Sequence, residues 1–177
     1  MNEIFIRPAA VGDIDALNDL IQSAYRGDAA RGGWTHEADL LDGQRIDPAG
    51  LADILVDPDQ HLLVAESTDG ALLGCVEVVD HGGGLAYLGL LSVAPQGQAK
   101  GLGKQLIAAA EAFARDHLGA TAMEMTVIRQ RSELIAYYER RGYRLTGEER
   151  PFPYGDERFG QPLSDALGFV VLARTLK

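Results

Sequence analysis

The chain has 177 residues, of which 26 are acidic and 16 are basic, and its formal net charge is −10. Its length and its 46% hydrophobic content predict one globular domain over residues 1–177 and exclude a disordered chain. The acidic balance argues against general affinity for nucleic acid or for an anionic membrane.

Signals for targeting, disulfides and metals are missing from the sequence. No apolar run approaches the roughly 18 residues of a membrane span, and the N-terminus lacks the basic start and apolar core of a signal peptide. The single cysteine, Cys75, excludes an internal disulfide and is expected to be a small core residue. No histidine pair or carboxylate cluster has the spacing of metal ligands, so we expect no metal and a soluble cytoplasmic protein.

The first half of the chain predicts a strand, helices and then a meander of three strands. Asp13 is a candidate cap for a first helix, whose apolar residues recur at helical spacing. The expected elements are a strand at 4–7, a helix from 14 that Gly27 ends, one or two short helices between 37 and 55, and strands at 61–66, 71–79 and 85–93.

The stretch 88–106 predicts a strand, a tight turn and the start of a helix. The first turn of such a helix leaves several backbone N–H groups without intrahelical partners and carries the positive end of the helix dipole. Gly101 and Gly103 remove the side chains that would keep an anion away from these donors. Two of the chain's three lysines, Lys100 and Lys104, lie here as well, which indicates a local site for a polyphosphate.

Two common nucleotide motifs do not fit this turn. A Walker A motif would need glycine at Gln98 and serine or threonine at Gln105, and a dinucleotide fingerprint would need glycine at Leu106. The sequence QAKGLG instead resembles the [QR]-x-x-G-x-G acetyl-coenzyme A loop of the GNAT superfamily of N-acetyltransferases, with Ala99 where the family often has glycine. The resemblance implies that this turn holds the pyrophosphate of coenzyme A, and the matching residues are Gln98, Ala99, Lys100, Gly101, Leu102, Gly103 and Lys104.

The second half of the chain alternates helices and strands. A helix ending near Gly119 is followed by a strand at 121–128, a helix at 132–141 with Ser132 as its candidate cap, a strand at 143–148, a loop at 149–165 and a last strand at 167–176. This is the pattern of a mixed α/β single domain, and its order is similar to that of GNAT proteins along nearly the whole chain. The resemblance implies a mixed, mostly antiparallel twisted sheet of about six to seven strands with helices on both faces.

A second motif, YYERRGY at 137–143, resembles the family signature [FLY]-Y-E-[KR]-x-G-[FY]. The resemblance implies that Tyr138 lies near the cofactor sulfur and protonates the leaving thiolate, which a phenol can do without being charged at neutral pH. The alternative is that Tyr138 only packs within an amphipathic helix, as we expect for Tyr137. The family's asparagine, seven residues before the tyrosine, is Arg131 here, either a ligand of a cofactor phosphate or a solvated surface charge.

The resemblance also implies where the thioester lies. In the family, a backbone N–H near the end of the preceding strand polarises the thioester carbonyl, and the residues beside it bind the pantetheine arm. The matching residues are Leu91, Ser92 and Val93, and Val93 is the candidate donor to the developing oxyanion. Nothing in the sequence requires a covalent acyl-enzyme, so we expect direct transfer.

The general base is less clearly marked. Many family members carry a glutamate on the strand before the cofactor turn, whereas residues 85–93 contain no carboxylate. Glu77 on the adjacent strand and Glu124 on the next one are the nearest groups that could take the proton of the attacking amine. Each could instead be a solvent-facing strand residue, and we favour that interpretation for Glu124.

Two loops are candidates for the acceptor site. The loop at 31–37 holds the only tryptophan, Trp34, which could grip an acceptor, while Glu37 could bind a cationic one. The loop at 150–160 could close over the acceptor with Tyr154 and Arg158. In both cases the alternative is an ordered loop whose aromatic residues only pack against the core.

We therefore expect an acetyl-coenzyme A-dependent N-acetyltransferase for a small amine or an amino acid-like acceptor. Two alternatives stay open: a non-catalytic acyl-coenzyme A sensor module, against which Tyr138 argues, and an N-acetyltransferase of proteins or peptides. The second would need an open groove, whereas the two loops suggest a covered pocket. The homodimer common in the family is a candidate assembly, and the fold does not name the acceptor.

Overall fold

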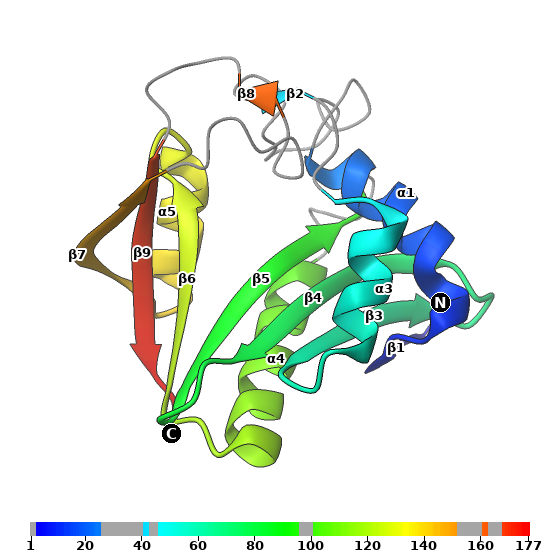
Figure 1. Ribbon diagram of the computed structural model, residues 1–177, viewed down its shortest axis with the longest axis horizontal. Helices are drawn as coiled ribbons and strands as arrows, with labels where there is room; N and C mark the ends of the chain where they lie inside the picture. Colours follow the sequence, from blue (N-terminus) through cyan, green and yellow to red (C-terminus); the bar gives the residue numbers. More distant parts are fainter. Residues whose placement is uncertain (1–2, 26–40, 43–45, 96–100, 152–160, 163–167) are drawn as a thin grey trace.

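The computed structural model describes residues 3–25, 41–42, 46–95, 101–151, 161–162 and 168–177. In these residues seven strands form one mixed sheet in the order β1-β3-β4-β5-β6-β9-β7, and β2 pairs with β8 separately (Figure 1). The strands are β1 (Ile4–Pro8), β2 (Leu41–Asp42), β3 (Gln60–Ser67), β4 (Leu72–Asp80), β5 (Leu85–Val93), β6 (Ala122–Ile128), β7 (Arg144–Pro151), β8 (Gln161–Pro162) and β9 (Gly168–Thr175). The helices are a 3-10 turn (Val11–Asp13), α1 (Ile14–Tyr25), α3 (Pro48–Val56), α4 (Leu102–Leu118) and α5 (Ser132–Arg140).

Helices cover both faces of the seven-stranded sheet, as the sequence predicted (Figure 1). On the α4 face, α4 and α5 pack on an apolar cluster that runs from β3 to β9 and includes Val76, Leu88 and Met125. On the α1 face, α1 and α3 pack on a second cluster, which takes Val64 from β3 and Cys75 from β4. Cys75 is the expected small core residue: it is fully buried, and this burial raises the pKa of its thiol to about 12.

The α4 helix forms because its apolar residues repeat at helical spacing and its ends are marked. Its buried stripe is Leu102, Leu106, Ile107, Ala110 and Ala114. Gly119 ends the helix in the left-handed conformation, with φ 66°, which a residue with a side chain adopts at a cost. The predicted helix is confirmed at both ends. Its first turn lies close to the end of β5, where Gly103 approaches Val93.

The sheet divides between β5 and β6. In the described residues these two parallel strands pair only at Leu85–Ala122, Ala86–Met123 and Tyr87–Glu124. Beyond this point, which we call the fork, they diverge, with β5 running toward α1 and β6 staying beside β9 (Figure 1). An irregularity in the β4–β5 pairing accompanies the divergence, because Leu90 takes φ 47°, and a residue in that conformation bends its strand away from a regular ladder.

Three local expectations are wrong. The strand expected at 143–148 extends to Pro151, because Pro151 still pairs with Gly168 of β9. The loop predicted at 149–165 contributes β8. Of the one or two short helices predicted between 37 and 55, the described residues form one, α3, and residues 41–42 form β2. Ser132 is not the cap of its helix, because Arg131 occupies the N-cap position of α5. Asp13 accepts a hydrogen bond from the Ala10 N–H in a capping box of the 3-10 turn that leads into α1, and it also accepts from Arg7.

None of the helices in the described part of the chain combines the length and the apolarity that crossing a membrane requires.

Candidate active site

The start of α4 presents backbone donors. Gly101, the N-cap, has φ 76° and offers no side chain to the first turn, and a Cβ placed on it would meet no atom within 4 Å. The first intrahelical bond runs from the Gln105 N–H to the Gly101 carbonyl, so the N–H groups of Leu102, Gly103 and Lys104 have no acceptor inside the helix. This arrangement suits an anion, as the sequence predicted for this turn.

The end of β5 and the end of α5 meet the same helical turn. A Cβ on Gly103 would lie 3.0 Å from the Tyr137 hydroxyl and 3.8 Å from Val93 Cγ2, so the absence of a side chain favours this close approach. Tyr137, expected to be a packing residue, therefore also brings a hydroxyl to the first turn of α4. Burial raises the pKa of Tyr137, and the positive charges of Arg141 and Arg140 oppose this shift.

Tyr138 lies in the core on the α4 face and is 5% exposed. Its ring meets those of Tyr137 and Tyr143 edge to face, with centroids 5.6 Å and 6.1 Å apart. Val93 and Leu102 belong to the same apolar cluster, which joins the predicted acid, the predicted oxyanion donor and the start of α4. The core position agrees with both interpretations of Tyr138, the acid and the packing residue, so the acid role stays a prediction.

Glu77 lies at the fork on the other face. It is 8% exposed, and it pairs in register with Gly89 of β5. A Cβ on Gly89 would lie 3.7 Å from Glu77 Oε2 and 3.2 Å from the Tyr87 ring, so the missing side chain leaves space beside the carboxylate. A buried carboxylate beside the divergence of β5 and β6 suits a base that receives a proton from an acceptor.

Glu124 does not face solvent, so the interpretation favoured for it is wrong. It is 8% exposed, Arg150 Nη2 donates to its Oε1 at 3.1 Å, and His81 Nδ1 lies 3.7 Å from the same oxygen. His81 stacks on Tyr87, with ring centroids 5.4 Å apart, and the Tyr87 and Thr126 hydroxyls hydrogen-bond at 2.5 Å. This polar cluster was missed, although the alternation of Glu124 and Thr126 with the methionines of β6 is a local signal for it.

Of the remaining predicted site residues, Ser92 and Arg131 are buried and Leu91 is half-buried. Ser92 is 2% exposed and donates its hydroxyl hydrogen to the Leu90 carbonyl at 3.0 Å, while Leu91 packs against the cluster on the α4 face. Arg131 is 3% exposed and lies 3.7 Å from Glu133, which overturns the solvated-charge alternative. Its role toward a phosphate remains a prediction.

The comparisons with known proteins identify the family. A family model described as "Acetyltransferase (GNAT) family" matches residues 14–143, which is most of the chain. The chain belongs to the GNAT family. GNAT membership makes it an acyltransferase of the N-acetyltransferase kind, as the two sequence motifs predicted. A search of curated protein sequences gives no significant match.

Solved GNAT structures share the fold over nearly the whole chain. Nourseothricin acetyltransferase is 22% identical, with a TM-score of 0.70, and the match covers 98% of this chain and 99% of that one. Mutant forms of the spermidine/spermine N-acetyltransferase SpeG from Vibrio cholerae are 14% identical, with a TM-score of 0.68 and coverages of 98% and 94%. The ribosomal-protein-S18-alanine N-acetyltransferase from Escherichia coli is 15% identical, with a TM-score of 0.71 and coverages of 99% and 95%. These similarities confirm the fold class.

GNAT acetyltransferases use acetyl-coenzyme A as the acetyl donor, and the residues of this chain fit that group. The open N–H groups of the first turn of α4 suit its pyrophosphate, and no side chain at Gly101 obstructs them. The fork lies along the strand that leads to this turn.

Seven predicted site residues lie outside the described part of the chain. They are Gln98, Ala99 and Lys100 of the cofactor turn, and Trp34, Glu37, Tyr154 and Arg158 of the two loops. The pairing of β2 with β8 does bring residues 41–42 beside 161–162, so the chain segments that follow the two loops meet. Within the described residues, no group of three or more histidine, cysteine or carboxylate side chains could hold a metal ion.

Proposed function

We propose that this protein transfers an acetyl group from acetyl-coenzyme A directly to the amine of a small molecule or an amino acid-like acceptor. The observation that carries the proposal is the fork: β5 leaves β6 after Tyr87, with buried Glu77 beside it on one face and the Val93–Gly103–Tyr137 contact at its far end. A divergence of this kind lets a cofactor arm pass from the turn at the start of α4 toward a base on the α1 face.

Each residue has a distinct role in this proposal. The first-turn N–H groups of α4 bind the pyrophosphate, and Leu91 and Ser92 bind the pantetheine arm. Acetyl-coenzyme A supplies an acetyl group already activated as a thioester. The Val93 N–H donates to the carbonyl oxygen, where negative charge develops during attack. Glu77 accepts the proton of the amine, directly or through a water molecule, and the Tyr138 hydroxyl gives a proton to the departing sulfur.

The charge of the site favours a cationic acceptor. The chain has a formal charge of −10, and Glu77 and Glu124 lie on one face near the fork. A protonated amine is attracted to such a region before it loses its proton. The names of two structural neighbours refer to a polyamine and an antibiotic, and that of a third refers to a ribosomal protein, so both acceptor classes occur on this fold.

The experiment is thiol release from acetyl-coenzyme A with a panel of amines, polyamines, amino acids and short peptides. We expect release that depends on a small amine, and a fall of about 100-fold in kcat for Tyr138→Phe, because the loss of a general acid costs this order of magnitude. Tyr143→Phe is the matched control. It removes the hydroxyl of a neighbouring buried tyrosine, one that donates to Glu111 at 2.9 Å, and its rate should stay within about threefold.

Three results would contradict the proposal. Binding of coenzyme A without release for any acceptor would favour the sensor. Release with peptides alone would assign a protein or peptide acceptor. Absence of coenzyme A binding would overturn the interpretation of the cofactor turn itself.

A further inference from the structure

The side chain of Tyr87 spans the opening of the fork on the α1 face. Among the described residues, Tyr87 and Glu124 are the last to pair β5 with β6, and beyond them the two strands diverge (Figure 1). The Tyr87 hydroxyl nevertheless reaches Thr126, two residues farther along β6, and the two hydroxyls hydrogen-bond at 2.5 Å. The ring therefore bridges the two strands just beyond their last paired residues.

Two neighbours hold this ring in place. His81 stacks on it, with ring centroids 5.4 Å apart and an interplanar angle of 25°, and the bond to Thr126 fixes the outer end of the phenol. His81 in turn lies 3.7 Å from the Glu124 carboxylate. A side chain that is held at both its face and its tip loses most of its rotamer freedom, so the Tyr87 ring forms a rigid wall.

The ring and the proposed base border the same space. Gly89 has no side chain, and a Cβ on it would lie 3.2 Å from Tyr87 Cε1 and 3.7 Å from Glu77 Oε2. An amine that gives its proton to Glu77 from this space lies about 3 Å from the carboxylate. The carbon that bears the amine is one bond away, so it meets the Tyr87 ring.

The consequence for the acceptor is steric. A methylene group beside the amine fits against the edge of a fixed ring, whereas a second carbon substituent on the same atom would have to displace the ring. That displacement would break the hydrogen bond to Thr126 or the stacking on His81. In a packed site, one additional methyl group changes kcat/KM by about 10-fold to 200-fold.

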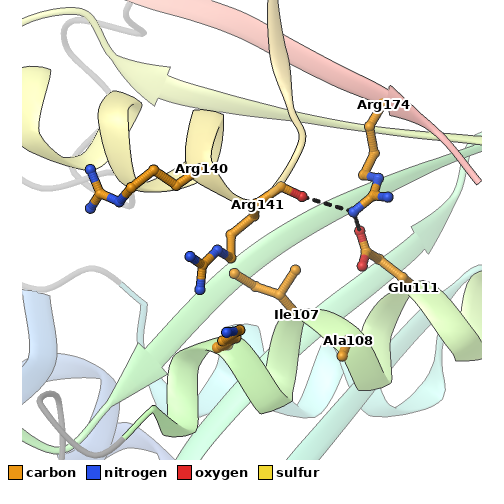
Figure 2. Close-up of a pocket in the computed structure, with 7 residues that line it drawn as sticks. Ile107, Ala108, Glu111, Arg140, Arg141 and Arg174 are labelled. Atoms are coloured by element: carbon orange, nitrogen blue, oxygen red, sulfur yellow. Dashed lines mark hydrogen bonds and ion pairs between the residues drawn. The ribbon is translucent and has the colours of Figure 1, made fainter.

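The charges near the fork act in the same direction. Glu77 and Glu124 are both 8% exposed on the α1 face, and Arg150 beside Glu124 already binds two carboxylates. Figure 2 shows Arg140 and Arg141 beside α4, on the opposite face of the sheet. An acceptor with a carboxylate on its amine-bearing carbon would bring that negative charge close to Glu77, where little water screens the repulsion.

We propose that Tyr87 selects the acceptor: it admits a primary amine on an unbranched carbon and excludes the α-amine of an amino acid, whose carbon carries both a branch and a carboxylate. This inference rests on the proposed function, because it takes Glu77 as the base. It narrows the acceptor to an alkylamine that ends in a methylene group and its amine. Tyr87 contacts the acceptor and determines specificity, while the proton passes to Glu77.

The test uses acceptors that carry both kinds of amine on one molecule. The diamine 1,4-diaminopentane has one amine on an unbranched carbon and one on a branched carbon, and lysine has a terminal amine and an α-amine beside a carboxylate. We expect the wild-type protein to favour the unbranched amine of each by about 10-fold to 200-fold, relative to uncatalysed acetylation by an acetyl thioester. NMR of the products measures the ratio of the two isomers.

Three variants test the wall directly. Tyr87→Ala removes it, so the ratio should fall toward that of the uncatalysed reaction. Tyr87→Phe and Thr126→Val each remove one hydroxyl of the bond and keep the size of the side chain, so each should lower the ratio by about threefold. These two variants decide the question if Tyr87→Ala does not fold. A merely structural role would lower the rate for both amines alike and leave the ratio unchanged.

Phe5→Ala is the matched control. Phe5 is half-exposed on the edge strand β1, and β3 and β4 separate that strand from β5, so its loss removes an aromatic ring without touching the fork. Its ratio should equal that of the wild type. Because the ratio is taken within one reaction, a smaller folded fraction changes both products alike.

The outcomes separate the two proposals. A wild-type ratio equal to that of the uncatalysed reaction, or a ratio that survives in the variants of the wall, would overturn the role of Tyr87 and leave the proposed function standing. Acetylation of other amines of the panel and of neither probe would also overturn that role. Failure of every amine to cause thiol release would overturn both proposals.

Discussion

The two faces of the central sheet differ in how far their apolar surface extends. On the α4 face, one apolar cluster crosses the sheet without interruption from Leu63 of β3 to Leu172 of β9. On the α1 face, the cluster includes Cys75 of β4 and Leu90 of β5 and does not continue into β6. There the next residues along the same face are Glu77, Tyr87, Glu124 and Thr126, since side chains alternate along each strand.

This difference indicates that the α4 face mainly stabilises the fold, whereas the α1 face can hold the polar groups that chemistry requires. The α4 face holds the sheet together on both sides of the fork, so β5 and β6 can diverge without loss of the fold. The α1 face can then bury carboxylates, which destabilise a protein unless they have partners or a function. Glu124 has partners, Arg150 and His81. Glu77 lies at the fork beside the space left by Gly89, and we propose that it serves as the base.

The largest effect should come from removing the Glu77 carboxylate. Glu77→Gln keeps the size of the side chain and abolishes the base, so kcat should fall about 100-fold to 1,000-fold, which is roughly 3–4 kcal/mol in the barrier. The variant should remain folded at the temperature of the assay. Acceptor-dependent thiol release and a melting curve measure the two effects.

Glu124→Gln is the matched control for this prediction. Both acids are 8% exposed on one face, and Arg150 and His81 hold Glu124. We expect its rate to stay within about threefold and its stability to fall by about 1 kcal/mol, because a charged hydrogen bond becomes a neutral one. A rate lost in Glu124→Gln and kept in Glu77→Gln would reverse the two assignments.

Two glycines test the packing of the two faces directly. On the α4 face, a Cβ on Gly74 would lie 2.7 Å from Leu106 Cδ1 and 2.9 Å from the Ser92 carbonyl oxygen, and this backbone atom cannot move away easily. Gly74→Ala should therefore lower the free energy of unfolding by about 2–3 kcal/mol, the usual upper range for an overpacked core. Urea denaturation measures this loss.

Gly89→Ala is its counterpart on the α1 face. The nearest atoms to the new Cβ belong to the side chains of Tyr87, at 3.2 Å, and Glu77, at 3.7 Å, which can rotate away. We expect less than about 1 kcal/mol of destabilisation but a clear loss of activity, because both side chains lie at the fork. An equal loss of stability at the two glycines would show that the α1 face is packed as tightly as the other.

The sequence predicts most strongly where the signal is local. The α4 helix has a continuous apolar stripe and glycine at both ends, and the described residues of the two motifs, 101–103 and 137–143, lie at the expected helices, so fold class and family follow from residues near one another. The confirmed core position of Cys75 also follows from its place in an apolar strand.

The errors arise where distant segments meet. Glu124 can be buried because Arg150 of β7, which is 26 residues away in the sequence, donates a hydrogen bond to it. No local sequence pattern predicts that contact. In the same way, pairing with β9 carries β7 through Pro151, past the point where local propensity would end the strand. Asp13 has the composition of a helix cap, but the nearby Arg7 competes for its carboxylate, which only the tertiary structure reveals.

A second cluster of charged side chains lies on the α1 face, away from the fork. Substitutions in it show whether every charged group on this face contributes to catalysis. At the far edge of the sheet, Arg7 donates to Asp13 at 2.8 Å and to Glu66 at 2.6 Å. These groups tie β1 to β3 and to the 3-10 turn before α1, far along the sheet from the fork. We therefore expect Asp13→Asn to leave the rate of acetyl transfer unchanged and to lower stability by about 1 kcal/mol, a small value because a third of Arg7 is exposed.

The pH dependence of that loss identifies its cause. Hydrogen bonds from Arg7 lower the pKa of Asp13 below its ordinary value of 3.8, so the folded state binds this proton less readily than the unfolded state. The stabilisation is therefore complete above the ordinary pKa and disappears as the pH falls through the lowered one. Urea denaturation of both proteins from about pH 7 to about pH 2 should show their stability difference shrinking toward zero in the acid range. A difference that persists unchanged there would assign the effect to the geometry of the turn and not to the charge of Asp13.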